Sequence, residues 1–264
     1  MALGFEPCAC GQFLGMISKY DLIRFLLRTA NTLLREKSYE FDRGASTISP
    51  RLEGPLQEEV VKAFQTVFSE PPWYENWAKD DVLGKMNREL TGNSFIVVLR
   101  GNADSPVAGF CWGGILNVGE LEEHITPALG ARPVGLQNAL MRVAGDDRIL
   151  YFHEFAILRA FRGGVEPLRL LLLPSLQFGW TQGVKRTLFW TTPASRIFPL
   201  SLYMGYEPIW KTESKGKDIF FMYHPNFAVF LRIIQRINGP SVAKIVRLNS
   251  RLFSRRMRGL TGEG

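Results

Sequence analysis

The chain has 264 residues, 46% of them hydrophobic and 22% charged, which is ordinary for a globular protein that buries a sizeable core in one large or two small domains. Its three cysteines are too few for a disulfide framework, and no apolar run approaches the roughly 18 residues of a membrane span, so we expect a soluble protein of a reducing compartment. The net charge of +7 favours an anionic partner, such as a phosphorylated ligand, an acidic carrier protein, a nucleic acid or a membrane surface.

The first 45 residues predict a helical extension. The first sixteen have no basic region before their apolar stretch, so we expect no signal peptide and a cytoplasmic location. Apolar residues recur at helical spacing between Leu22 and Leu34, whereas Arg24 and Arg28 share another face, which is typical of a basic amphipathic helix. The stretch "DRGASTISPRLEGP" breaks this pattern, and we place the start of a domain near Ser46.

Residues 46–224 alternate helix and strand signals. Two helices are followed by two β-branched, aromatic strands that form a hairpin, and then by residues 117–147, which we treat as an insertion with weak helical signals. The rest of this zone reads as strand, long helix, strand, short helix and two closing strands. The predicted helices are at 56–68, 78–90 and 168–183, with a short one that ends at 206. The predicted strands are at 93–101, 106–116, 149–158, 185–192, 207–212 and 219–224.

Residues 225–264 form a basic tail. No acidic residue lies between Asp218 and Glu263, and basic side chains recur along one predicted helical face, opposite an apolar stripe. The basic residues of this face are Lys244, Arg247, Arg251, Arg255 and Arg258.

Three roles are open for this tail. It can lie on an anionic membrane as a peripheral anchor, with Phe227, Phe230, Leu231 and Ile234 facing the lipid. Alternatively, its apolar stripe packs against the N-terminal helix, within one chain or across a homodimer. Nucleic-acid binding ranks last, because few aromatic residues lie among the cations to stack on bases.

The order of these elements, together with the stretches "VFSEPPWYENW", "HEFAILRAFRGG", "GVKRTLFWTT" and "LYMGYEPI", resembles the GNAT superfamily of N-acetyltransferase-like acyltransferases over residues 46–224. The resemblance implies an α/β fold in which helices flank a mixed, mostly antiparallel, twisted sheet. The strands ending near Arg159 and Thr192 would be parallel neighbours. It also implies transfer of an acyl group from acetyl-CoA or another acyl-CoA to a small-molecule or peptide amine.

The resemblance also assigns residues to the acyl donor. The central strand of the family splays from its neighbour at a bulge, where backbone N–H groups bind the acyl carbonyl and the pantetheine arm. By position these N–H groups come from Phe155, Ala156 and Ile157. The following turn, which holds the pyrophosphate in the family, corresponds to Arg162, Gly163, Gly164 and Val165.

This turn departs from the family pattern. Val165 stands where a glycine belongs, Pro167 replaces a second small residue, and Glu166 adds negative charge. Proline also removes one possible donor to phosphate at the helix N-terminus. These changes favour a donor that depends less on the turn, such as an acyl carrier protein, or a GNAT-like binding protein without activity.

Acyl transfer to an amine requires a base and an acid. The resemblance implies that Glu154 is the base. Alternatively, Glu154 is a structural carboxylate that pairs with an arginine on the face of the sheet. We expect His153 to point to the opposite face and to be structural. The acid of the family would fall on Ser201; on acidity we favour Tyr203, two residues later, which is otherwise a packed aromatic residue.

Two further groups carry weaker signals. The single Cys8/Cys10 pair and the scattered histidines predict no metal site. The aromatic residues Trp73, Tyr74 and Trp77 form either a wall of the acceptor pocket or a cap on the core.

Overall fold

The computed structural model describes residues 46–49, 51–101, 105–129, 135–145, 147–162 and 166–228. The predicted N-terminal extension, Cys8 and Cys10, Gly163 to Val165 and all of the tail beyond Ala228 lie outside these residues. The described helices are α3 (Gly54–Ser69), α4 (Lys79–Glu89), α5 (Val118–Leu129), α6 (Leu136–Ala144), the 3-10 turn η1 (Arg159–Phe161), α7 (Glu166–Thr181) and α8 (Ile197–Tyr203).

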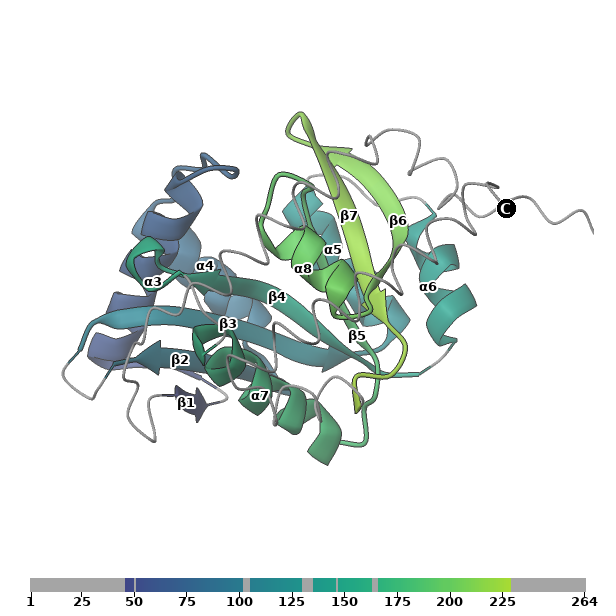
Figure 1. The fold of residues 1–264 in the computed structure, drawn as a ribbon, viewed down its shortest axis with the longest axis horizontal. Coiled ribbons are helices and arrows are strands. Elements are labelled where there is room, and N and C mark those ends of the chain that lie inside the picture. The colour runs from purple at the N-terminus through teal and green to yellow at the C-terminus, as the bar shows by residue number, and fades with distance from the viewer. Residues whose placement is uncertain are drawn as a thin grey trace, which may run out of the picture.

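The described strands form one seven-stranded sheet with the order β1-β2-β3-β4-β5-β7-β6 (Figure 1). Their bounds are β1 (Ser46–Ser49), β2 (Ser94–Arg100), β3 (Val107–Leu116), β4 (Ile149–Ile157), β5 (Thr187–Thr191), β6 (Glu207–Ser214) and β7 (Lys217–His224). All neighbours in this sheet are antiparallel except β4 and β5, which α7 connects as the crossover that a parallel pair requires. The predicted mixed, mostly antiparallel sheet and the parallel pair are confirmed.

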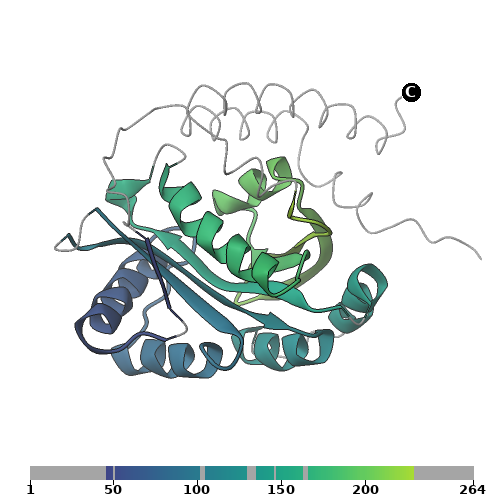
Figure 2. The same ribbon diagram turned by 90° about the horizontal axis from the view of Figure 1, so that it is seen from below.

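Helices cover both faces of the sheet, with α3, α4, α5 and α6 on one side and α7 and α8 on the other (Figure 2). Strand β2 shows why both faces need a cover, because its side chains alternate between the two cores. Phe95 and Val97 belong to the core under α7, whereas Ile96 and Val98 belong to the core under α3 and α4.

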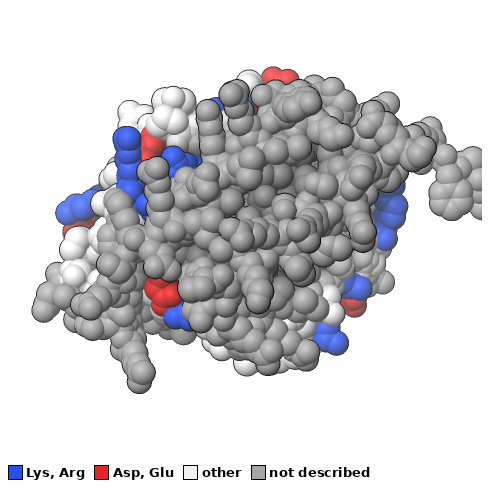
Figure 3. Space-filling view, viewed as in Figure 1, with Lys and Arg blue, Asp and Glu red and all other residues white. Residues whose placement is uncertain are grey.

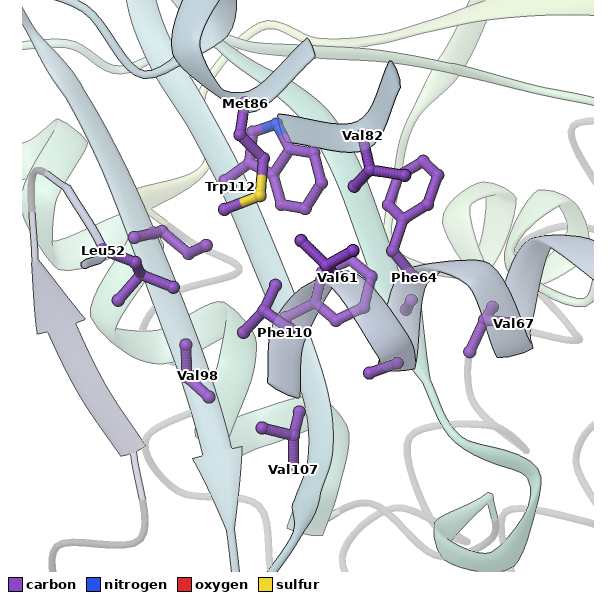
Figure 4. Close-up of a cluster of buried hydrophobic side chains, with 14 of the residues drawn as sticks. Leu52, Val61, Phe64, Val67, Val82, Met86, Val98, Val107, Phe110 and Trp112 are labelled. Atoms are coloured by element: carbon purple, nitrogen blue, oxygen red, sulfur yellow. The ribbon is translucent and has the colours of Figure 1, made fainter. Parts of the chain in front are cut away.

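The core under α3 and α4 is built on stacked aromatic rings (Figure 4). Phe64 of α3 stacks on Trp112 of β3, with 5.6 Å between the ring centroids, and Trp112 stacks on Phe110 at 5.2 Å. Val82 and Met86 of α4 pack into the same fully buried cluster. Because such close aromatic packing leaves the side chains little room to move, it fixes the position of α4 over β3. The polar end of α4, which is described below, is held in place in the same way.

The predicted insertion at 117–147 contains α5 and α6, whose apolar faces belong to a core shared with the sheet. Leu121, Ile125 and Leu140 are buried in one cluster with Tyr151 of β4 and Phe221 of β7. This segment therefore covers the sheet beyond α4 on the same face.

Phe227, just after β7, corrects one prediction. We expected this ring to face lipid, but it is fully buried in the core under α7, and its backbone N–H donates to the Lys185 carbonyl over 2.8 Å. A Cβ on Gly179 of α7 would lie 3.3 Å from its ring. The prediction is wrong because the ring fills the space between α7 and the sheet, and the compact fold therefore continues past the predicted boundary at residue 224.

Candidate active site

A β-bulge interrupts the pairing of β3 with β4. Trp112 pairs with Glu154 and Gly113 pairs with Phe152, so His153 is an extra residue on β4. At this point the backbones approach so closely that a Cβ on Gly113 would lie 2.1 Å from the Tyr151 carbonyl oxygen. A residue with a side chain at position 113 would therefore require the two strands to move apart.

The bulge changes which side chains face α3 and α4. Before it, Phe152 belongs to the core under α7 and Tyr151 to the core on the opposite face. After it, Ala156 belongs to the core under α3 and α4, and Phe155 packs on the α7 side. Glu154 shares the face of Ala156 and therefore points toward α4.

Strands β4 and β5 separate immediately beyond their first residues. Their only pairs in the described chain are Leu150 with Thr187 and Tyr151 with Leu188. A cavity of about 320 Å³ occupies the opening that follows. Its walls include Glu154 and Phe155 of β4, Leu172 of α7, Trp190 of β5, Tyr206, the loop residues Trp73, Glu75 and Trp77, and Lys215 of the β6–β7 turn.

The backbone amides of β4 alternate between β3 and this opening. Leu158 N–H donates to the Ala108 carbonyl of β3 over 2.9 Å, which fixes the direction of the amides before it. In an extended strand, Ala156 N–H then faces β3 as well, whereas Phe155 and Ile157 N–H face the opening. Of the three predicted carbonyl donors, Phe155 and Ile157 have the suitable direction.

Glu154 ends in a buried network of charged groups. Lys85 Nζ lies 3.0 Å from Glu154 Oε1 and 2.6 Å from Glu89 Oε1. Trp112 Nε1 donates to Glu89 Oε2 over 2.8 Å, and His153 Nδ1 lies 3.5 Å from the same oxygen. The two carboxylates therefore share one ammonium, and Glu89 holds two further partners.

Burial and these charges move the pKa values of the two carboxyl groups apart. Burial raises the pKa of Glu154 to about 7, against the attraction of Lys85 and with the repulsion of Glu89. Burial also acts to raise the pKa of Glu89, but His153 and Lys85 outweigh it and lower that pKa well below its ordinary value. For Lys85, burial opposes the charged form, yet Glu154 and Glu89 outweigh it and raise the pKa. Glu154 is thus a carboxylate able to accept a proton near neutral pH.

The predicted orientation of His153 is wrong. Simple alternation along a strand would place it opposite Glu154, but the bulge brings both side chains to the Lys85–Glu89 pair. The imidazole is buried, and within the described residues its Nε2 has no hydrogen-bond partner. The alternative role of Glu154 was an ion pair with an arginine. In the structure Glu154 does form an ion pair, but its partner is Lys85 of α4.

The aromatic stretch after α3 lines the cavity in part. Trp73 and Trp77 lie in its wall, and Trp73 makes an edge contact with Trp190 of β5 at 5.9 Å. Tyr74, by contrast, is 71% exposed. The same two indoles also pack against the core under α3 and α4, so they serve both as wall and as cap.

The predicted pyrophosphate turn is flanked by ion pairs. Arg162 Nε donates to the Ile157 carbonyl over 2.7 Å, and its Nη1 lies 2.6 Å from Glu70 Oε2 at the end of α3. Glu166, the first residue of α7, pairs with Arg169 at 2.5 Å, which offsets part of its negative charge. A role for Arg162, Gly163, Gly164 and Val165 in binding the donor stays a prediction.

The candidate acids lie on and after α8. Tyr203 is the last residue of this helix, and its role stays a prediction. Ser201 is buried and donates to the Phe198 carbonyl over 2.6 Å. Tyr206 lines the cavity, accepts a hydrogen bond from Thr187 over 2.8 Å, and has a pKa that burial raises.

Several site residues were not predicted from the sequence. Lys85 and Glu89 lie four positions apart on a helix that reads as polar, and that spacing was the available signal for a pair. Glu75 and Lys215 are 140 positions apart, and no local pattern connects them.

The strand order, the single parallel pair and the bulged, splayed β4 define a GNAT-like fold. No protein-family model and no curated protein sequence matches the chain. Among solved structures, it is similar to NAA60 of Arabidopsis thaliana in complex with a bisubstrate analogue, at 11% identity and a TM-score of 0.46 over 68% of this chain and 97% of that one. It is also similar to a polyamine N-acetyltransferase of Drosophila melanogaster, at 15% identity and a TM-score of 0.45 over 68% and 99% of the two chains. A third is the ribosomal-protein-S18-alanine N-acetyltransferase of Escherichia coli, at 12% identity and a TM-score of 0.43 over 69% and 94%.

The residues that the structure describes also bear on two other kinds of site. In that part of the chain, no cluster of three or more histidine, cysteine, aspartate or glutamate side chains is arranged to hold a metal ion. Its helices are all too short or too polar to cross a membrane. On the face of Figure 3, the described basic and acidic side chains are interspersed.

Proposed function

We propose that this chain is an N-acyltransferase that moves an acyl group from a pantetheine thioester to an amine by direct attack. The observation that carries the proposal is the position of Glu154. Its carboxylate lines the cavity at the opening between β4 and β5, and burial raises its pKa to about 7. An acceptor of protons near neutral pH at this place is what an attacking amine requires.

The chain's own groups suggest how the reaction proceeds. The N–H groups of Phe155 and Ile157 face the opening and would hold the thioester carbonyl, where negative charge develops during attack. The amine nitrogen forms a bond to the carbonyl carbon and gives its proton to Glu154. The carbon–sulfur bond then breaks, and Tyr203 returns a proton to the leaving thiolate. Lys85 and Glu89 would act as positioning residues, because they hold Glu154 and set its proton affinity.

The donor is either an acyl-CoA, such as acetyl-CoA, or an acyl carrier protein. The opening beside β4 suits the pantetheine arm that both donors share. Glu166 at the start of α7 and the Arg162–Glu70 pair disfavour a pyrophosphate there, and the net charge of +7 suits an acidic carrier. Calorimetric titration with acetyl-CoA, longer acyl-CoAs and acyl carrier protein distinguishes these donors. If no pantetheine thioester binds, the proposal fails.

A binding protein without activity is the second candidate, and the same ion pairs at the predicted turn favour it. Mass spectrometry of a panel of amines incubated with each thioester separates the two. An acylated amine, formed together with one equivalent of free thiol, supports the enzyme. Thioester binding with no product from any amine supports the binding protein.

For the tail, peripheral attachment to an anionic membrane and packing against the N-terminal helix or a second copy both remain proposals. Flotation with anionic and neutral liposomes tests the first. The comparison chain should end at Ala228, because Phe227 belongs to the core. Equal flotation of both chains, or of neither, would contradict a membrane anchor.

A further inference from the structure

Glu75 lines the cavity with its carboxylate held in place. Its backbone N–H donates to the Phe68 carbonyl over 2.8 Å, and Trp77 Nε1 donates to its Oε2 over 2.9 Å. Its second oxygen, Oε1, lies 3.1 Å from Lys215 Nζ. The carboxylate is only 22% exposed and lines the same cavity as Glu154. It is therefore an oriented anion with one oxygen turned to an ammonium group.

Two ammonium groups lie at this place, one from the turn between β6 and β7 and one from the first residue of β7, and both reach the loop after α3. Lys215 and Gly216 form the turn with φ of 51° and 70°. Lys215 Nζ lies 5.9 Å from the centre of the Trp77 ring, and Lys217 Nζ lies 5.7 Å from that of Trp73. Lys217 also donates to the Trp73 carbonyl. A carboxylate bonded to the N–H of an indole whose face lies near an ammonium group is a chemistry that binds organic cations.

The lysine at this site is easily replaced. Its side chain is 65% exposed, and ion pairs with so exposed a partner contribute little stability. Another ammonium group bound to Glu75 would restore the same charge contact, so the exchange costs little. Glu75 is also close enough to Glu154 that its negative charge contributes to the raised pKa of Glu154. The cavity wall thus holds two carboxylates, Glu154 at the opening of β4 and Glu75 beside Lys215.

We propose that Glu75 and Trp77 bind the second cation of a small aliphatic diamine, and that Lys215 occupies this cation site in the structure. The first amino group of the diamine would then lie toward Glu154. A cavity of about 320 Å³ suits a ligand of this size. The inference rests on the proposed function for the fate of the first amino group, but the binding itself requires no thioester.

Binding can be measured on the full chain by tryptophan fluorescence, because Trp73, Trp77 and Trp190 line the cavity. The probes are linear α,ω-diamines of increasing length, each compared with the monoamine of the same carbon count. We expect one diamine length to bind about tenfold more tightly than its monoamine, the gain of a hydrogen bond to a charged group. Glu75→Gln should abolish this preference. Lys215→Ala should tighten diamine binding about two- to fivefold and leave monoamine binding unchanged.

The exposed pair Glu58–Lys79, at 3.0 Å, supplies matched controls, and neither Glu58→Gln nor Lys79→Ala should change the preference. Equal binding of diamines and monoamines at every length would overturn the inference, as would a diamine preference that survives Glu75→Gln. Weaker diamine binding in Lys215→Ala would also overturn it. If a monoamine is acylated but no diamine preference exists, the proposed function stands and the inference fails. If diamines bind as expected but no amine of any kind is acylated, the inference stands and the proposed function fails.

Discussion

Lys85 and Glu154 form a buried ion pair, with Lys85 Nζ 3.0 Å from Glu154 Oε1. The same ammonium lies closer to Glu89, at 2.6 Å, and Glu89 also accepts from Trp112. One cation thus faces two carboxylates that are unequally stabilised. Glu89 is held as the anion, and Glu154 becomes the group that exchanges a proton near neutral pH. Separation of the pKa values of two neighbouring acids is a common way to assign them different roles.

Replacement of Glu154 tests its role as the base. Glu154→Gln keeps the shape of the side chain and removes the proton acceptor, so we expect kcat to fall by about 10²- to 10⁴-fold. In the wild-type chain, kcat/KM should rise with pH and level off above about 7, where Glu154 is ionised. The variant should lose this dependence while it still binds the donor in calorimetry. A variant with full activity and an unchanged pH profile would exclude Glu154 as the base.

Removal of the shared ammonium should change both the pH profile and the stability. In Lys85→Met, Glu154 loses the positive charge that opposes its raised pKa, so the midpoint of the activity profile should move above 7. The variant should also unfold more easily, by about 3–5 kcal/mol, because two buried carboxylates lose their partner. Lys79→Met, in an exposed pair, is the matched control and should change neither quantity. A midpoint that stays in place would mean that Lys85 does not set the proton affinity of Glu154.

The raised pKa of Glu154 also predicts how stability depends on pH. Its ordinary value is 4.5 and its folded value about 7, so the folded state binds the proton more tightly than the unfolded state. The resulting stabilisation is fully present below pH 4.5 and is lost as the pH rises through about 7, a loss of up to about 3 kcal/mol. Glu89 has the opposite sign, since its lowered pKa stabilises the fold above pH 4.5 and its effect disappears only in stronger acid.

Denaturant unfolding of the wild-type chain and Glu154→Gln between pH 5 and 8 isolates the Glu154 contribution, because Glu89 stays ionised and the contributions of His124 and His224 are common to both chains. Glu154→Gln has no charge to lose, so its stability relative to the wild-type chain should increase steadily from pH 5 to pH 8. A difference that does not change with pH would contradict the raised pKa.

The sequence predicted the parts of the fold that depend on local patterns. The sequence predicts the strands β2 and β3 from their β-branched runs, and it predicts the order of β4, α7 and β5. These predictions succeed because strand alternation and helical periodicity reflect burial along one continuous segment. The two helices at 117–147 gave only weak signals. Their apolar faces are completed by Tyr151 and Phe221, which lie far away in the sequence.

The candidate site was only partly predictable for a related reason. Glu154 stood in a recognisable strand, but the orientation of His153 depends on a bulge that forms only when β4 pairs with β3. The helix that carries Lys85 and Glu89 has a polar pattern typical of a solvent-exposed element. Its polar end can be buried because Trp112 of β3 donates a hydrogen bond to Glu89 and Glu154 of β4 pairs with Lys85. Such compensation is a property of the tertiary structure and has no local signature.

Two tyrosines compete for the role of the acid, and matched variants separate them. If Tyr203 protonates the leaving thiolate, Tyr203→Phe should lower kcat by about 10²- to 10⁴-fold and remove the alkaline limb of the pH profile. Tyr206 lies in the cavity wall but pairs with Thr187, so Tyr206→Phe should mainly lower stability, by about 1 kcal/mol. Single-turnover thiol release and thermal unfolding measure the two effects. The reverse result, with kcat lost only in Tyr206→Phe, would assign the acid to Tyr206.

Truncation measures how much Phe227 contributes to the core. Phe227 is fully buried in the core beneath α7, and its backbone N–H bonds to the Lys185 carbonyl. A chain that ends at Ala228 keeps both contacts and is the reference for the shorter chain. A chain that ends at Pro225 leaves a cavity beside Gly179 and Leu150 and should lose about 3–5 kcal/mol, as should Phe227→Ala. Denaturant unfolding of the three variants measures this loss. Equal stability of the chains that end at Pro225 and Ala228 would mean that Phe227 is not part of the core in solution.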